Sequence, residues 1–184
     1  LARAPVGVVN TGTAPVRAVI GVAGNPAARE GALAQGYELE RRYFHLDGKP
    51  ADPAKVRQNE RLVAVLTVTE REARQAQVLL VDFLPAGFEI DNPRLVDSGD
   101  VAALAWLTRD VEPAHVEYRD DRLVAAFTRD PDQSAFFSVA YVVRAVTPGR
   151  YLHPPAVVED MFRPERFGRT GFGAVEVLGD RGPR

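Results

Sequence analysis

The side chains of this chain best suited to chemistry are three histidines, His45, His115 and His153, because imidazoles bind zinc and act as general bases. No two of them lie close together in the sequence. His115 shares a predicted strand face with Glu117, and carboxylates follow His153 a few residues later. Scattered surface histidines and carboxylates are the common case in proteins. We therefore predict no metal site and no catalytic histidine.

Nucleophilic catalysis is also unsupported. The chain has no cysteine, which removes a thiol nucleophile, a thiolate metal ligand and a disulfide framework. Its serines, Ser98, Ser134 and Ser138, lie outside any Gly-x-Ser-x-Gly motif and have no evident base nearby in sequence. Glycine-rich stretches at 21–24 and 168–173 lack the strand, loop and helix order of a phosphate-binding loop. We predict no catalytic residue and no cofactor.

Composition narrows the class of protein. The 184 residues are 46% hydrophobic and 26% charged, which is typical of a folded globular domain. The net charge of -2 offers no general attraction for nucleic acid. No apolar run reaches the roughly 18 residues of a membrane-spanning helix. The chain begins without an initiator methionine or a signal-peptide pattern, so we expect it to be a fragment of something larger.

The elements that would position these side chains are mostly strands. Residues typical of turns separate the predicted strands. Parallel pairing would need long crossover connections between them, so the sequence favours an antiparallel β-sandwich. One stretch, residues 98–109, has a helical period and predicts a single short α-helix, capped by Ser98 or Asp100. Alternation and β-branched or aromatic residues predict strands at 16–22, 37–44, 61–69, 76–84, 116–119, 123–128, 135–146 and 173–178.

The chain divides near residue 30. Residues 24–36 are rich in Gly and Ala, follow neither period and indicate a linker. Before it, the predicted strand 16–22 has a candidate partner at 6–9, across a turn-prone segment. We therefore predict residues 1–30 as a piece of a neighbouring domain and residues 31–184 as the main domain.

A long connection is predicted between residues 151 and 171, stiffened by three prolines. A connection of about 20 residues is uncommon in a compact domain and is often functional. It either covers an open end of the sandwich or docks on another surface, and both roles are compatible. Its large apolar residues are Val157, Val158, Met161, Phe162 and Phe167.

Residues 36–44, 81–90, 117–127 and 144–165 resemble, in order, the C-terminal macroglobulin-like domain of bacterial alpha-2-macroglobulins, at the position of the eukaryotic receptor-binding domain. The resemblance covers about residues 36–178 and implies a macroglobulin-like β-sandwich. Residues before about 30 resemble the closing strands of the CUB-like domain that precedes it.

The resemblance also implies a function. Family members are large periplasmic proteins, often lipid-anchored, that act as broad-spectrum protease traps: cleavage of a bait region triggers a rearrangement, and an internal thioester, in members that have one, binds the protease. The C-terminal domain packs against the thioester domain and shields it. The partners implied are the thioester and CUB-like domains of the parent chain, and proteases through the full-length protein. This chain has no bait region and no Cys-x-Glu-Gln motif, so we expect it to be non-catalytic.

By resemblance, residues 157–166 lie against the thioester domain, with Met161 and Phe162 at the position of a family Met-Tyr pair. Phe162 lacks the tyrosine hydroxyl, which leaves open whether the parent protein carries a thioester. An apolar cover excludes water and slows hydrolysis of an activated acyl bond. The expected docking residues are Val157, Val158, Met161, Phe162 and Phe167.

Two other functions remain open. A free-standing periplasmic or secreted adhesion or carbohydrate-binding β-sandwich would display exposed aromatic residues such as Tyr118, Tyr151 or Phe172. A hydrolase would bring His115 and carboxylates together in a deep pocket. The exposure of these side chains separates the three functions.

Overall fold

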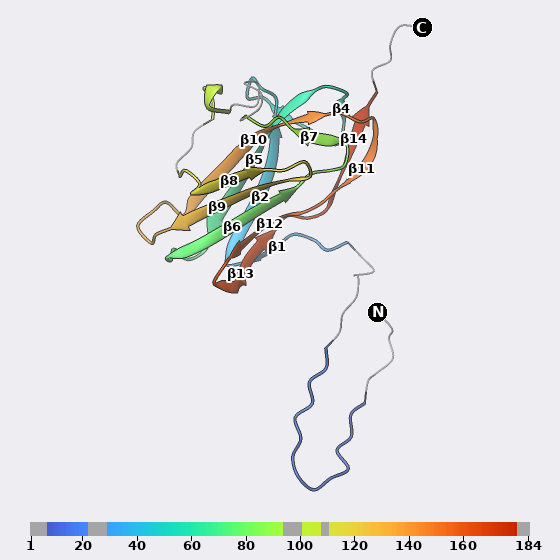
Figure 1. Ribbon diagram of the computed structural model, residues 1–184, viewed down its shortest axis with the longest axis vertical. Coiled ribbons are helices and arrows are strands. Elements are labelled where there is room, and N and C mark those ends of the chain that lie inside the picture. Colours follow the sequence, from blue (N-terminus) through green and yellow to red (C-terminus); the bar gives the residue numbers. More distant parts are fainter. Residues whose placement is uncertain (1–6, 22–28, 94–100, 108–110, 180–184) are drawn as a thin grey trace. The chain divides into compact units, whose positions relative to one another are not determined.

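The computed structural model describes residues 7–21, 29–93, 101–107 and 111–179. The chain divides into two compact units, residues 1–30 and residues 31–184, and each is described by itself. The described strands of the second unit form three sheets (Figure 1).

The largest sheet has six strands in the order β1-β13-β12-β6-β9-β8, and every neighbouring pair in it is antiparallel. Its first strand pairs with a strand from near the end of the chain, Leu33 lying opposite Arg169. The strands are β1 (Leu33–Gln35), β6 (Ala76–Phe83), β8 (His115–Tyr118), β9 (Arg122–Arg129), β12 (Ala156–Asp160) and β13 (Arg163–Arg169).

The second sheet has five strands in the order β3-β2-β5-β10-β7, also antiparallel throughout. Its inward face follows from period-2 alternation: in β2, Tyr37, Leu39 and Tyr43 are buried, while Glu38 and Glu40 are exposed. The strands are β2 (Tyr37–Phe44), β3 (Pro50–Ala51), β5 (Arg61–Glu70), β7 (Phe88–Ile90) and β10 (Phe136–Ala145).

A small third sheet has the order β11-β14-β4. It consists of β4 (Val56–Arg57), β11 (Gly149–His153) and β14 (Gly173–Leu178), and β14 pairs with β4 in parallel. This sheet again joins an early strand to the end of the chain.

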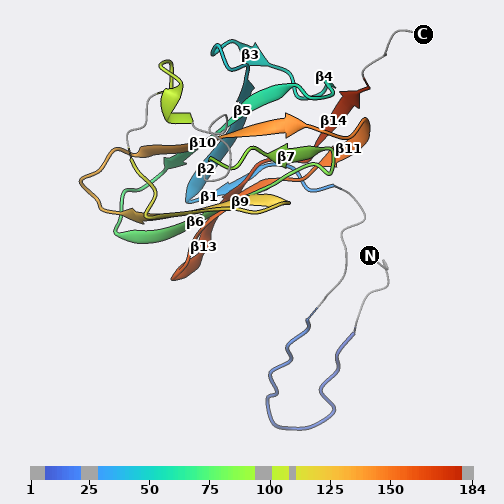
Figure 2. The same cartoon turned by 45° about the horizontal axis from the view of Figure 1, so that its top comes forward.

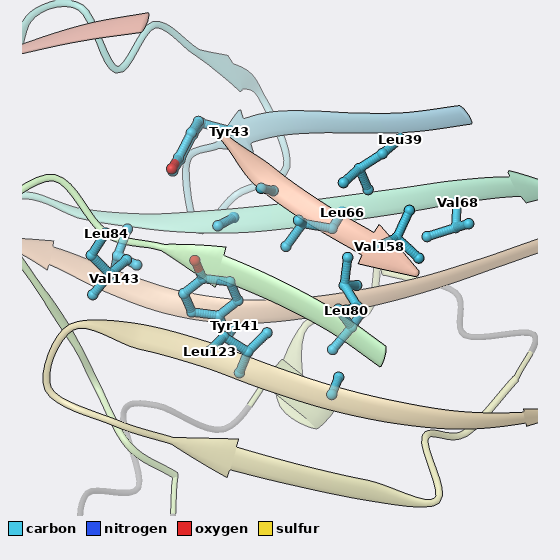
Figure 3. Close-up of a cluster of buried hydrophobic side chains, with 14 of the residues drawn as sticks. Leu39, Tyr43, Leu66, Val68, Leu80, Leu84, Leu123, Tyr141, Val143 and Val158 are labelled. Carbon is cyan, nitrogen blue, oxygen red and sulfur yellow. The ribbon is translucent and has the colours of Figure 1, made fainter. Parts of the chain in front are cut away.

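The core lies between the six-stranded and five-stranded sheets, which form two layers (Figure 2). Figure 3 shows Leu66 and Val68 of β5 in one cluster with Leu80 of β6 and Val158 of β12. Each of these four side chains is completely buried. The fold is therefore mainly β with antiparallel sheets packed together, which confirms the predicted fold class.

The predicted α-helix at 98–109 is not formed in the part of it that is described, residues 101–107. There the chain makes a single 3₁₀ turn, Val101–Ala103, with a hydrogen bond from Leu104 N to Val101 O (3.1 Å). Val101 and Trp106 pack on the outer face of the five-stranded sheet, and Trp106 Nε1 donates to the carbonyl oxygen of Leu46 (3.0 Å). The segment therefore covers the sheet as a short 3₁₀ turn. Its packing on the sheet outweighs the tendency to form an α-helix that the sequence period indicated.

Within the first unit, the strand predicted at 16–22 is not formed across residues 16–21, and described residues 7–21 contain no strand. The turn-prone segment does form a local turn: Gly12 N donates to Asn10 Oδ1 (2.9 Å) and Asn10 Nδ2 to Ala14 O (2.8 Å). Val9 and Val19 are 82% and 88% exposed. An alternating pattern makes a stable strand only beside a partner, and the described residues of this unit contain none. The assignment of residues 1–30 to a preceding domain stays a prediction.

Candidate functional site

The region predicted as a long connection is a set of strands. Residues 151–171 contain the end of β11, all of β12 and all of β13. Pro154 and Pro155 separate β11 from β12. Pro164 lies where the register of β12 and β13 shifts, between the pairs Glu159–Phe167 and Asp160–Arg163. Because proline is tolerated at strand ends and bulges, these prolines punctuate strands and do not mark a loop.

The five residues predicted for docking are divided by the sheet. Val158 is completely buried in the core and faces away from any partner. Val157 and Phe167 are half-buried on the alternate face of the same sheet, which points outward. Met161 and Phe162 are 56% and 78% exposed at the turn that joins β12 to β13. We call Met161 and Phe162 the docking tip.

The docking tip is a two-residue hairpin loop, since Asp160 pairs directly with Arg163. Such loops usually carry Asn or Gly with positive φ, and among the described residues neither tip residue has a positive φ. Both tip amides are nonetheless hydrogen-bonded: Met161 N donates to Gln77 O (2.8 Å) and Phe162 N to Asp160 Oδ1 (3.0 Å). The backbone that displays the two apolar side chains is therefore fixed from inside the protein.

Asp160 holds this turn in place. Its side chain is completely buried, and Arg163 Nε donates to its Oδ2 (2.8 Å). The same guanidinium also donates through Nη2 to the carbonyl oxygen of Gln75, the residue that precedes β6. One carboxylate thus connects the tip backbone, the first residue of β13 and, through Arg163, the neighbouring strand.

We expect Asp160→Ala to loosen the docking tip and to lower the free energy of unfolding by about 1.5–3 kcal/mol, the range for hydrogen bonds to a charged group. Asp160→Asn keeps an acceptor for Phe162 N and should cost less. Urea unfolding and hydrogen exchange of the Phe162 amide measure both effects. Glu165→Ala, an exposed position in the same hairpin, is the matched control. Unchanged exchange of the Phe162 amide in Asp160→Ala would contradict the assignment.

The histidines do not form a catalytic or metal-binding group. His153 is buried, and its Nε2 lies 2.9 Å from the Tyr43 hydroxyl. Burial, helped by nearby Arg41, lowers the pKa of His153 to about 3, so the ring is neutral at physiological pH. His45 and His115 belong to other segments; His45 is half-buried and His115 is exposed. Among the described residues, no cluster of three or more His, Asp or Glu side chains is arranged to hold a metal ion.

The aromatic residues considered for adhesion are not displayed together. Tyr118 and Tyr151 pack against the main hydrophobic core, and the Tyr151 hydroxyl donates to the carbonyl oxygen of Pro148 (3.1 Å). Phe172 is 37% exposed. The largest exposed fractions among the described Phe, Tyr and Trp side chains belong instead to Phe136 and Phe162.

Two buried ionic clusters, which the sequence patterns did not predict, join the two main sheets. In the first, Arg41 of β2 forms an ion pair with Asp82 of β6, and Tyr141 of β10 donates to Asp82 Oδ2 (2.7 Å). Arg41 Nη2 also donates to Pro154 O (2.8 Å), at the entry to β12. Burial raises the pKa of Asp82, and Arg41 offsets part of that rise.

The second cluster lies around Arg129 of β9, whose side chain is completely buried. Its Nη2 is 3.1 Å from Glu70 Oε2, and its Nη1 donates to Gln133 Oε1 (2.7 Å). The guanidinium also stacks over the Phe137 ring, 4.5 Å from the centroid. All polar contacts of this arginine are therefore made inside the protein.

The chain is similar to known proteins over most of its length. Residues 36–165 match the model of the bacterial alpha-2-macroglobulin MG10 domain. An alpha-2-macroglobulin of Xylella fastidiosa is 38% identical over 181 residues, which is 92% of this chain and 11% of that protein. The alpha-2-macroglobulin of Escherichia coli K12 is 31% identical over 86% of this chain and 10% of that protein. The chain thus spans about a tenth of the length of these relatives.

Solved structures agree with this similarity. Escherichia coli alpha-2-macroglobulin activated by porcine elastase superposes with a TM-score of 0.71 at 30% identity, over 84% of this chain and 14% of that one. The trypsin-activated form gives a TM-score of 0.72 at 28% identity, over 84% of this chain and 11% of that one. The matching family model and the identity of these relatives show that the chain belongs to the bacterial alpha-2-macroglobulins as an MG10 domain, which confirms both the predicted family and the prediction that it is not an enzyme.

Proposed function

We propose that this chain is the non-catalytic C-terminal domain of a broad-spectrum protease trap, and that its docking tip packs against the thioester domain of the parent protein and shields it from water. The observation that supports this proposal most is that the docking tip is apolar and exposed, on a turn whose backbone is held by hydrogen bonds. Relatives whose structures match this chain include forms activated by elastase and by trypsin, which supports an encounter with proteases through the full-length protein.

The physical chemistry of the docking tip fits an apolar recess. Burying a side chain the size of Met or Phe contributes about 1.5–3 kcal/mol, and Met161 and Phe162 leave most of that unused, being 56% and 78% exposed. Since both tip amides are already hydrogen-bonded, docking orders little further backbone and loses little entropy. Phe162 has no hydroxyl to donate, so the contact acts by excluding water and by shape.

We expect Met161→Asp in the full-length protein to weaken docking at least tenfold, because a buried carboxylate without a partner is strongly unfavourable. The full-length protein should lose protease trapping and, where it holds a thioester, thioester lifetime. Met161 is exposed, so the unfolding free energy of the isolated chain should change by only about 0.5 kcal/mol. Phe136→Asp is the matched control, because Phe136 is also 56% exposed but lies on the other main sheet.

Docking itself is measured as binding of this chain to the remainder of its parent protein, before and after protease treatment. Binding that is lost on cleavage supports a conformational latch. If Met161→Asp leaves binding, trapping and thioester lifetime as they are in the Phe136→Asp control, the proposed role of the tip is wrong.

The first unit supports a second contact within the parent protein. Val9 and Val19 are almost fully exposed, and the turn between them is formed. We propose that residues 1–30 are the closing strands of the preceding CUB-like domain and pair within its sheet. The parent protein would be periplasmic and lipid-anchored. Among the described residues, no helical segment is long and apolar enough to span a bilayer.

A further inference from the structure

The outer face of the six-stranded sheet is apolar where a solvated sheet would be polar. In β6 the buried positions Val78 and Leu80 face the core, so Leu79 and Val81 point outward. The same strand places the charged residue Asp82 inside. Antiparallel sheets with one solvated face usually show the reverse pattern, apolar inside and polar outside. The outward apolar residues of β6 therefore require an explanation other than the core.

The register shows that these residues form one continuous area. Val81 lies opposite Val157 of β12 on one side and Val124 of β9 on the other. Leu79, in the adjacent row, lies opposite Ala126 of β9. We call these five residues the outer apolar patch; β12, β6 and β9 lie side by side in Figure 1. Residues opposite the patch members in the same rows are charged or titratable: Arg169, Glu159, Glu117 and His115.

The protein covers the comparable face of its other sheet but leaves this one open among the described residues. On the five-stranded sheet, outward Val63 and Val142 are buried beneath Val101 and Trp106. The members of the outer apolar patch belong to neither hydrophobic cluster formed by the described residues, and they are only half-buried. An apolar centre with a charged rim is the usual anatomy of an interface between protein surfaces.

We propose that the outer apolar patch is an interface with a flat apolar face of another domain in the same longer polypeptide. The relatives are about ten times longer than this chain, which makes up 11% of the Xylella fastidiosa protein, so covalently linked domains surround an MG10 domain at high effective concentration. Val157 lies on the same strand, β12, as the turn that carries the docking tip, with Glu159 of the charged rim between them. Sheet faces pack about 10 Å apart, and a flat partner suits this surface. The proposal does not depend on what the docking tip contacts.

Thiol reactivity tests the proposal directly, because this chain has no cysteine of its own. Val81→Cys and Val124→Cys are prepared in the 184-residue chain and in the full-length protein, and labelling by a maleimide is followed by mass spectrometry of the peptide concerned. Glu38→Cys is the control, since Glu38 is exposed on the other main sheet. Each rate is divided by the rate of the control in the same protein.

In the 184-residue chain we expect both patch thiols to react within about tenfold of the control, and in the full-length protein their relative rates should fall at least tenfold further. Equal relative rates in the two proteins would overturn the proposal. So would patch thiols that are already protected in the 184-residue chain, because the patch is then covered within this chain or by a second copy. Sedimentation velocity identifies the second copy, and a monomer is the expected result.

Discussion

Replacing Arg41 by methionine is expected to lower the free energy of unfolding by about 3–5 kcal/mol at neutral pH, the cost of leaving a buried charge without its partner. Asp82 is completely buried between the main sheets, with Arg41 as its ion-pair partner and the Tyr141 hydroxyl as a donor. Methionine fills much of the space of the arginine stem but supplies no charge. The variant also loses the hydrogen bond to Pro154 O.

The effect of Arg41→Met should depend on pH. Burial raises the pKa of Asp82 above its ordinary value of 3.8, while Arg41 lowers it, so the variant raises that pKa further. A carboxyl with a raised folded-state pKa binds its proton more tightly in the folded state. The stabilisation that the Asp82 carboxyl contributes is then greatest below its pKa in the unfolded state. It is lost as the pH rises through its pKa in the folded state. The deficit of the variant should therefore be small near about pH 4 and largest near about pH 7.

Urea unfolding of the 184-residue chain at both pH values measures this effect. Arg41→Met combined with Asp82→Asn removes the unpaired charge while keeping an acceptor for the Tyr141 hydroxyl, and should recover most of the loss. Arg42→Met is the matched control, because the Arg42 side chain is 66% exposed. A deficit that is the same at both pH values, or that the double variant does not reduce, would show that lost packing and not charge is responsible.

The second large effect is expected at Arg129. Arg129→Met leaves Glu70, whose side chain is 1% exposed, without its ion-pair partner, so we expect a loss of about 3–5 kcal/mol in unfolding free energy. It also removes the stacking of the guanidinium on Phe137 and the hydrogen bond to Gln133. Adding Glu70→Leu should restore much of the stability, since a buried ion pair replaced by apolar side chains is often neutral or stabilising.

Thermal and urea unfolding of the two single variants and the double variant give the coupling energy between the two side chains. A coupling near zero would mean that the two charges act independently. Arg122→Met, on the same strand but paired at the surface with Asp121, should change the unfolding free energy far less, because exposed ion pairs contribute little, and serves as the control.

The sheet layers of the fold could be predicted because the alternation of inward and outward residues can be recognised within a single strand. Residues 37–44 and 76–84 were predicted as strands, and β2 and β6 occupy almost the same ranges. Residues 151–171 were misread because three prolines suggested a loop. The structure places Pro164 at a bulge within the pairing of β12 and β13. Whether a proline interrupts a strand or fits a bulge depends on the neighbouring strand, which sequence spacing does not identify.

Only some residues of the candidate site could be predicted, for a similar reason. Met161 and Phe162 were found through a family resemblance, and the structure displays both, whereas Val158 of the same group is inside the core. Asp160 was missed as the residue that holds the turn, although an acid and an arginine flanking two apolar residues is a visible pattern. The pairing of Arg41 with Asp82 joins residues 41 positions apart, and a polar residue at an inward position does not reveal its partner.

The pairing of β1 with β13 has a consequence for synthesis on the ribosome. Leu33 cannot meet Arg169 until the chain between them has been made, and at about 5–20 residues per second this takes roughly ten seconds. The parallel pair β4 and β14 waits as long. We expect the domain to complete its sheets only after its last strands leave the exit tunnel, and its nascent form to rely on chaperones until then.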